Sequence, residues 1–538
     1  MYCCVNSASV WGIEPYIVKI EADVSNGMPY FNMVGLLGSE VKESRERVRT
    51  AMKNSGVSFP VNRITVNLSP ADRKKEGTGF DLPIAVSILC AMGRLDISMF
   101  EGTLIMGELG LDGEIKPVRG ILPVISMAKK CGISRYIIPE GNRNEGGIIS
   151  SVNVISFRKL AEIIDCFEHK DLKDDIFQTR AINRSDKICN KNADTYSVSD
   201  IQDCFCSDEP DSERDYSQII GQEAVKRALL IAAAGWHNIL MIGPPGVGKS
   251  MLASRIPSIM PVPDMEEQLE ISGIHSICGL LEDGRLVMKR PFSAPHHSIT
   301  SAALIGGGRI PKPGEITIAH KGVLFLDELP EFHPKVIDLL RQPLEEKVVK
   351  IHRTGGSYIF PADCLLVAAM NPCRCGYFPN RNKCNCSEHD IDAYLSRISG
   401  PLLDRIDMSI EVPQVKLDDM QLNEIMHHAG GAEMKIMSSE DMRIKVDAAM
   451  KFQINRQGRK HNGRLTVDEI KRYCMLDYKS SEFMKEAYRK FGLSMRGYYK
   501  IIKVARTIAD IEESEKISIT HLAESLAYRM SDKKYFNK

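Results

Sequence analysis

The chain has 538 residues, so at about 150 residues per domain it is too long for one domain and we expect three or four. Its 70 Lys and Arg residues balance its 70 Asp and Glu residues, which excludes a partner held by bulk charge alone. No apolar run reaches the roughly 18 residues that span a bilayer and the first residues lack a signal-peptide pattern, so we expect a cytoplasmic protein without a membrane partner.

Residues 1–167 alternate between strand and helix patterns. Apolar stretches predict strands at residues 16–24, 63–68, 104–108 and 136–139. Apolar residues at helical spacing predict helices at residues 39–54, 81–92 and 120–132. This alternation is typical of an α/β domain.

Residues 168–216 differ from the rest of the chain in composition. They contain 13 acidic and 7 basic residues and almost no sustained apolar pattern. Segments of this kind bury too little apolar surface to fold, and they often connect domains. We therefore expect an acidic, flexible linker of net charge −6, which leaves +6 on the remainder of the chain.

A glycine-rich segment follows the apolar stretch at residues 238–242 and precedes a helical pattern. It consists of Gly243, Pro244, Pro245, Gly246, Val247, Gly248, Lys249 and Ser250, which is the G-x-x-x-x-G-K-[ST] pattern of a phosphate loop. In such loops backbone N–H groups surround phosphate oxygens, the lysine reaches the β- and γ-phosphates, and the serine hydroxyl binds Mg²⁺. The motif therefore predicts a site for ATP and Mg²⁺.

Two later strands end in polar residues that suit ATP hydrolysis. The apolar stretch at residues 323–326 is followed by Asp327 and Glu328. At the end of a buried strand, Asp327 would hold the Mg²⁺ and Glu328 would polarise the attacking water. A further apolar stretch at residues 364–369 leads to Asn371, whose amide would orient that water.

Arg405 and Arg496 are candidates to neutralise charge in the transition state, although each taken alone is more often a surface or salt-bridge residue. Specific motifs include Arg290-Pro-Phe-Ser-Ala-Pro-His-His-Ser298 and Ser399-Gly-Pro-Leu-Leu-Asp-Arg-Ile-Asp407. With these motifs nearly the whole chain resembles the ComM/YifB-like family of magnesium-chelatase-like AAA+ ATPases. The resemblance implies that Asn371 is the sensor-1 residue, Arg405 an arginine finger that acts on the neighbouring subunit, and Arg496 the sensor-2 residue.

Residues 77–86 and 107–120 resemble the proteolytic domain of Lon-type proteases, which has a ribosomal-S5-like α/β fold. The places of its catalytic serine and lysine hold Ile84 and Leu122, which can neither attack a carbonyl nor accept a proton, so we expect no peptidase activity. The resemblance implies an inactive Lon-protease-like domain at residues 1–167, the linker at 168–216, an AAA+ core with magnesium-chelatase-like inserts at 217–412, and a helical lid at 413–538. Helices are expected in the lid at residues 417–428, 439–455, 480–490, 498–511 and 520–528.

The family resemblance implies a hexameric ring with a helix-2 insert, within residues 272–314, and a presensor hairpin, within residues 348–360, that project into a pore. Lys350, His352 and Arg353 in the hairpin would follow a phosphate backbone or lie on a solvated strand face. The expected function is a DNA translocase or branch-migration helicase that acts on single-stranded or branched DNA in natural transformation or recombination. The alternative is a chelatase-type or Lon-like remodeller that acts on a protein client.

Cys373, Cys375, Cys384 and Cys386 form two C-x-C motifs in a loop rich in polar residues. Four thiolates suit a tetrahedral Zn²⁺ site, so structural Zn²⁺ and free thiols both stay open as interpretations. His296 and His297 are also adjacent, but neighbouring side chains diverge on a strand or a helix. We therefore expect a structural or pore-facing role for these two histidines.

Overall fold

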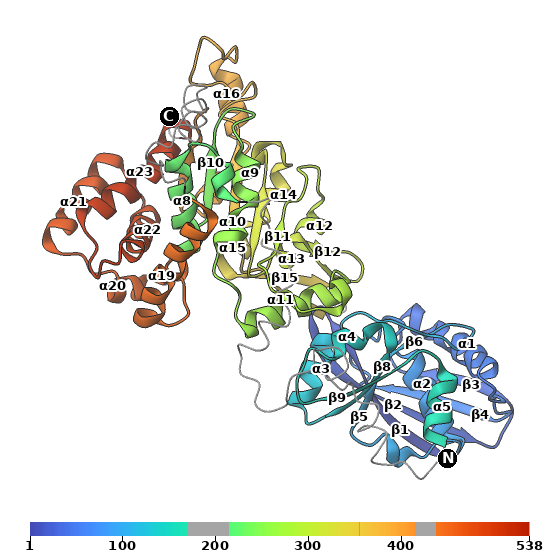
Figure 1. The fold of residues 1–538 in the computed structure, drawn as a ribbon. Helices are drawn as coiled ribbons and strands as arrows, with labels where there is room; N and C mark the ends of the chain where they lie inside the picture. The colour runs from blue at the N-terminus through green and yellow to red at the C-terminus, as the bar shows by residue number, and fades with distance from the viewer. Residues whose placement is uncertain (169–214, 354–355, 415–436, 537–538) are drawn as a thin grey trace, which may run out of the picture. The chain divides into compact units, whose positions relative to one another are not determined.

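The computed structural model describes residues 1–168, 215–353, 356–414 and 437–536 (Figure 1). Residues 169–214 of the expected linker, the expected helix at 417–428 and Gly355 of the expected hairpin lie outside the described residues. The chain divides into two compact units. The first comprises Met1–Cys204, Met265–Val287 and Ile351–Ile359, and the second comprises Phe205–Asp264, Met288–Lys350 and Phe360–Lys538. The domain boundaries expected from the sequence stay a prediction.

The first unit contains a seven-stranded mixed sheet in the order β3-β4-β2-β1-β5-β8-β9. Its strands are β1 (Tyr2–Trp11), β2 (Glu14–Ser25), β3 (Tyr30–Val34), β4 (Arg63–Ser69), β5 (Thr103–Ile105), β8 (Arg135–Pro139) and β9 (Asn153–Phe157). On β8, Tyr136 and Ile138 belong to a buried cluster with helix α3 (Ile121–Lys130), whereas Ile137 belongs to a cluster with α1 (Ser39–Asn54) and α2 (Asp81–Ala91). Because successive side chains of a strand point to opposite faces, helices cover both faces of this sheet.

Helices α1 and α2 bury different shares of their surface. In α1 the buried residues Val41, Val48 and Met52 recur at helical spacing, so one stripe of the helix faces the core. Every residue of α2 is buried, including Ile84 at the place of the protease serine. Leu122 at the start of α3 is also buried. Both positions therefore form part of the apolar core.

The second unit contains a five-stranded parallel sheet in the order β11-β14-β17-β10-β18. Its strands are β10 (Ile239–Ile242), β11 (Phe292–Ser293), β14 (Val323–Leu326), β17 (Leu365–Met370) and β18 (Met408–Glu411). All residues of β10, β14 and β17 are buried, which is typical of parallel strands covered on both faces. Ile242 pairs with Met370, and Leu326 pairs with Ala368. The loops after these three strands therefore leave the same edge of the sheet.

The C-terminal part of the second unit is helical. It consists of α19 (Ser439–Gln457), α20 (Val467–Tyr473), α21 (Tyr478–Phe491), α22 (Met495–Ile511) and α23 (Ile519–Phe536). Val504 and Ile508 of α22 are buried in the same cluster as β10 and helix α8 (Glu223–Gly235). The mixed α/β class, the parallel sheet and the helical C-terminal region confirm the fold class expected from the sequence.

The remaining α-helices and β-strands are mostly short. They are β6 (Glu108–Leu109), β7 (Ile115–Lys116), α4 (Arg143–Gly146), α5 (Leu160–Glu168), α9 (Lys249–Ser254), α10 (Ile256–Ile259), α11 (Met265–Cys278), α12 (Ser301–Ile305), β12 (Gly306–Gly307), β13 (Lys312–Pro313), α13 (Glu315–Ile318), α14 (Pro334–Asp338), α15 (Arg341–Glu346), β15 (Val348–Arg353), β16 (Gly356–Pro361), α16 (Glu388–Leu395) and α17 (Gly400–Leu403). Strands β15 and β16 pair as the expected hairpin. In the described ranges, none of the helices is long and apolar enough to cross a bilayer.

Candidate nucleotide-binding site

The glycine-rich loop connects β10 to α9, as the sequence predicted. Gly246 and Gly248 have φ angles of 77° and 85°, a left-handed conformation that favours glycine. A Cβ atom on Gly243 would lie 2.4 Å from the carbonyl oxygen of Val412, so no larger residue fits there without moving the backbone of Val412. The three glycines therefore set the backbone path of the loop.

Lys249 links the glycine-rich loop to the end of β17. Its Nζ donates hydrogen bonds to the carbonyl oxygens of Gly243 (2.7 Å) and Pro244 (2.8 Å) and to Oδ1 of Asn371 (3.0 Å). Burial lowers the pKa of Lys249, and the nearby Asp327 partly offsets this effect. The ammonium group is thus held where two of the loops at the sheet edge meet.

Ser250 and Asp327 bring two oxygen atoms together beside this lysine. Ser250 Oγ donates a 2.5 Å hydrogen bond to Asp327 Oδ2. The backbone N–H of Glu328 donates to the other carboxylate oxygen of Asp327, at 2.8 Å. A hydroxyl and a carboxylate are ligands that Mg²⁺ prefers, so the side chains present fit a nucleotide-bound Mg²⁺.

Glu328 lies beside a histidine that the sequence analysis did not place at the site. Glu328 has a φ of 52°, and its Oε2 lies 3.4 Å from Nδ1 of His297. The short strand β11 explains this contact, because it pairs in parallel with β14 and Ser293 aligns with Leu324. His297 and Glu328 each come four residues after these partners. Recognising β11 in the sequence would have located His297.

The structure brings Arg405 and Arg496 together on one carboxylate. Glu345 of α15 bonds the guanidinium of Arg405 through Oε2 and that of Arg496 through Oε1, the latter at 3.3 Å. Arg405 also donates to the carbonyl oxygen of Pro401 at 3.0 Å. Among the described residues, neither arginine is bonded to the phosphate loop. No sequence pattern pointed to Glu345.

The basic residues of the hairpin are exposed and partly paired. Lys350 forms an ion pair with Glu346 at 2.8 Å, and His352 Nδ1 lies 2.8 Å from Ser357 Oγ. Arg353 is also exposed. A phosphate-tracking role and a solvated strand face both stay open for these side chains.

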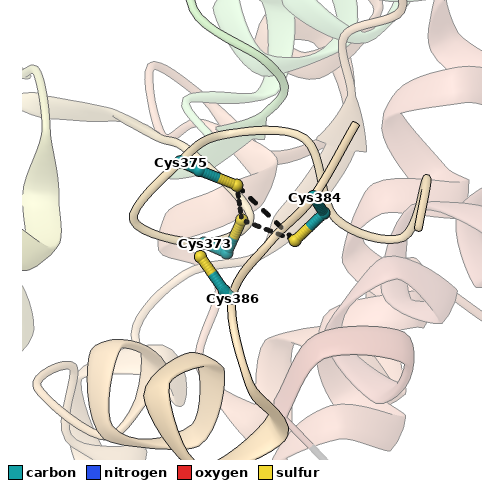
Figure 2. Close-up of side chains that lie close together, drawn as sticks. All are labelled: Cys373, Cys375, Cys384 and Cys386. Carbon is teal, nitrogen blue, oxygen red and sulfur yellow. Dashed lines mark hydrogen bonds between the residues drawn. The ribbon is translucent and has the colours of Figure 1, made fainter. Parts of the chain in front are cut away.

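The four cysteines of the C-x-C motifs meet in the loop between β17 and α16. Figure 2 shows their sulfur atoms pointing toward one another, and all four lie within 4.8 Å. Cys373 and Cys384 are buried, and Cys375 and Cys386 are half-buried. The structure therefore brings the two C-x-C motifs together, and the choice between structural Zn²⁺ and free thiols stays a prediction.

Family models match three parts of the chain. The model described as magnesium chelatase, subunit ChlI, matches residues 215–420. A second model, subunit ChlI of Mg-chelatase, matches residues 20–142. A third, magnesium chelatase, subunit ChlI C-terminal, matches residues 436–529.

Two bacterial relatives match over nearly the whole chain, and a third matches over a shorter part. The competence protein ComM of Haemophilus influenzae is 41% identical over 98% of this chain and 97% of its own. The YifB protein of Escherichia coli is 37% identical over 98% of this chain and 97% of its own. The magnesium-chelatase 38 kDa subunit of Cereibacter sphaeroides is 25% identical over 29% of this chain and 52% of its own.

Proposed function

The chain belongs to the ComM/YifB-like family of magnesium-chelatase-like AAA+ ATPases, and from this premise we propose that it is a ring-forming motor that uses ATP to move along DNA. Its substrate is single-stranded or branched DNA, and its task is branch migration in natural transformation or recombination. The observation that carries the proposal is the 41% identity, over 97% of the relative, to a protein named for competence. Membership of the AAA+ class implies ATP and Mg²⁺ as cofactors.

The residues at the sheet edge have distinct roles in the proposed hydrolysis. ATP with Mg²⁺ supplies the phosphoanhydride bond and a positive charge against the phosphates. Lys249 binds phosphate oxygens in exchange for its bonds to the loop carbonyls. Ser250 and Asp327 would hold the Mg²⁺ through the hydroxyl and carboxylate oxygens that here share a hydrogen bond. Glu328 accepts a proton from the attacking water, and Asn371 orients that water.

The proposed assembly is a hexameric ring. Arg405 and Arg496 act on the ATP of the neighbouring subunit, where their charge stabilises the transition state of γ-phosphate transfer. The shared contact with Glu345 supports this assignment, because it holds both guanidinium groups at one place on the chain. In the ring the neighbour's phosphates compete with Glu345 for the two arginines.

The hairpin is the proposed contact with DNA. The exposed side chains of Lys350, His352 and Arg353 would follow the phosphate backbone of a strand inside the ring. The test is the ATPase rate with and without single-stranded or forked DNA, combined with DNA binding at increasing salt. We expect stimulation by DNA and binding that weakens steeply with salt. Unstimulated ATPase and no salt-sensitive binding would contradict the proposal.

A protein client is the second candidate. The observation that favours it is the match of three regions to models of a magnesium-chelatase subunit. A chelatase-type or Lon-like remodeller would hydrolyse ATP at the same site and pull on a polypeptide. Intact ATPase activity that ignores DNA but responds to an unfolded protein would favour this candidate.

The compartment and the remaining cofactor complete the proposal. We place the motor in the cytoplasm, where thiols stay reduced. The cysteines that the structure describes are free of disulfides, which supports that assignment. A structural Zn²⁺ on the four clustered cysteines is the additional cofactor.

A further inference from the structure

The separations within the cysteine cluster suit four ligands around one ion. The Sγ atoms of Cys373 and Cys375 are 3.3 Å apart, those of Cys373 and Cys384 are 3.7 Å apart, and those of Cys375 and Cys384 are 3.5 Å apart (Figure 2). Around a tetrahedral Zn²⁺ with bonds of about 2.3 Å, sulfur atoms are about 3.8 Å apart. In a disulfide they are about 2 Å apart. These separations therefore fit a tetrahedral metal site and exclude disulfide bonds between these sulfur atoms.

The loop that carries the cysteines has little apolar support. Between Asn371 and Ser387 the described chain forms no helix or strand, and its exposed side chains include those of Tyr377 and Arg381. Its buried side chains include Cys373 and Cys384 themselves. In a segment with so small a core, bonds from ligands to a metal supply the folding energy.

One hydrogen bond reaches a cysteine sulfur, and two others hold the backbone around the cluster. The backbone N–H of Phe378 donates to Cys373 Sγ at 3.4 Å. The backbone N–H of Cys384 donates to the carbonyl oxygen of Asn380 at 2.9 Å, and Arg381 donates to the carbonyl oxygen of Cys386 at 3.0 Å. Such surrounding bonds orient ligands and tune the metal.

The same loop supports the nucleotide site from two directions. Asn371, which accepts a bond from Lys249, precedes Cys373 by two residues. Farther along, Gly376 has a φ of 86°, and a Cβ atom there would lie 2.5 Å from Cδ of Pro245 in the phosphate loop. The cysteine loop thus lies directly against the glycine-rich loop.

We propose that Zn²⁺ bound by Cys373, Cys375, Cys384 and Cys386 fixes the loop that supports the phosphate loop, so that nucleotide binding depends on the metal. The inference rests on the proposed ATP site and not on the proposed movement along DNA. Loss of the metal frees Gly376 from Pro245 and releases Asn371 from its position beside Lys249.

Metal content and nucleotide affinity of the full chain test this proposal together. We expect one Zn²⁺ per chain by elemental analysis, and an intense sulfur-to-metal absorption band when Co²⁺ replaces it. Protein depleted of Zn²⁺ and returned to Mg²⁺ buffer should bind a non-hydrolysable ATP analogue about tenfold more weakly or worse, as when a supporting residue is lost. Added Zn²⁺ should restore the affinity. Metal-depleted protein that stays folded and binds the analogue equally well would overturn the proposal.

Two variants and a control separate coupling from unfolding. Cys384→Ser should lose Zn²⁺, whereas Cys131→Ser, which removes an exposed thiol of the first unit, should keep both Zn²⁺ and nucleotide affinity. Gly376→Ala keeps all four thiols and should keep Zn²⁺ but weaken nucleotide binding through the clash with Pro245. Full Zn²⁺ content in Cys384→Ser, or unchanged nucleotide affinity in Gly376→Ala, would contradict the inference. Zn²⁺-dependent nucleotide binding without any response to DNA would instead contradict the proposed DNA motor.

Discussion

Asp327 and Glu328 are adjacent in the sequence but have different partners. Asp327 accepts bonds from Ser250 and from the backbone N–H of Glu328, so both of its oxygens are used beside the phosphate loop. The carboxylate of Glu328 is more exposed and faces His297 at 3.4 Å. The first carboxylate is therefore suited to a metal and the second to a water molecule.

Glu328→Gln separates nucleotide binding from hydrolysis. The amide keeps the size of the side chain but cannot take a proton from water, so we expect unchanged ATP affinity and a turnover rate at least ~100-fold lower. Equilibrium binding and single-turnover hydrolysis measure the two quantities. Glu440→Gln, on the surface of α19, is the control and should leave both unchanged. Undiminished turnover in Glu328→Gln would show that another group activates the water.

The 3.4 Å separation between His297 Nδ1 and Glu328 Oε2 predicts that His297 positions the Glu328 carboxylate. His297→Ala should lower kcat by about tenfold, a typical loss when a group that orients a reacting side chain is removed, and should leave KM unchanged. His297→Asn keeps a hydrogen-bonding atom on a short side chain and should recover part of the rate. His389→Ala, at an exposed position of α16, serves as the control. Equal losses in all three variants would indicate a general structural defect.

His461 makes stability depend on pH. It stacks on Trp236 at 4.5 Å, and burial, together with Arg290 and Arg464, lowers its pKa to about 3. An unfolded histidine has a pKa of about 6.5, so between these two values the unfolded chain binds the extra proton. The stability contributed by neutral His461 is therefore complete above pH 6.5 and falls with pH toward 3.

Urea unfolding at pH 7.5 and pH 5.0 measures this effect. Because each pH unit below about 6.5 costs up to about 1.4 kcal/mol, lowering the pH to 5.0 should remove about 2 kcal/mol more from the native chain than from His461→Phe. His389→Gln, at an exposed position, should behave like the native chain. The same pH slope in His461→Phe and the native chain would contradict the assignment.

At the scale of elements, segments with an apolar run or a helical period were predictable, and segments without such a pattern were not. The helix predicted at residues 39–54 has the bounds of α1 (Ser39–Asn54). Strand β1 has small and polar residues at Asn6, Ser7 and Ser9, and it is defined by its pairing with β2 and β5. Strand β11 is too short for any period to show. Tertiary pairing, which a local pattern does not contain, decided both strands.

The candidate site also contains contacts that the sequence predicted and contacts that only the fold revealed. The phosphate loop, Asp327 and Asn371 each follow a buried strand, and parallel strands bring their ends to one edge, so their proximity was predictable. The contact of Glu345 with Arg405 and Arg496 was not predictable, because it depends on where α15 lies in the fold. The sequence suggested a Zn²⁺ site on the two C-x-C motifs but left free thiols open, and the contact of Gly376 with Pro245 needed the fold.

At the scale of the whole molecule, zero net charge is an average over unlike parts. Residues 168–216 carry −6, and the remaining chain carries +6. A motor that encloses its track has no need of a strongly basic surface, and weak electrostatic binding favours release in each cycle. The charge balance is therefore compatible with a DNA partner held by topology.

The shared position of Arg405 and Arg496 on Glu345 leads to a prediction about the whole ring. We assume that Arg405 completes the ATP site of a neighbouring subunit. A subunit with Arg405→Ala then keeps a native phosphate loop and Glu328, and a subunit with Glu328→Gln keeps a native Arg405. Each variant alone should be inactive as an ATPase. Rings formed from equal amounts of both should regain activity, because about one quarter of their interfaces combine a native Glu328 with a native Arg405.

The control pairs two variants on the same side of the interface. Ser250→Ala and Glu328→Gln both alter the loops at the sheet edge, so their mixtures contain no interface with a complete set of residues. Steady-state ATPase rates of the two mixtures, formed by assembling rings from mixed subunits, then distinguish the models. If ATPase activity recovers only in the mixture of Arg405→Ala with Glu328→Gln, each active site contains residues of two chains. If neither mixture recovers activity, Arg405 acts on the ATP of its own subunit. In that case Arg405 would have to leave Glu345 and turn toward the phosphate loop of the same chain.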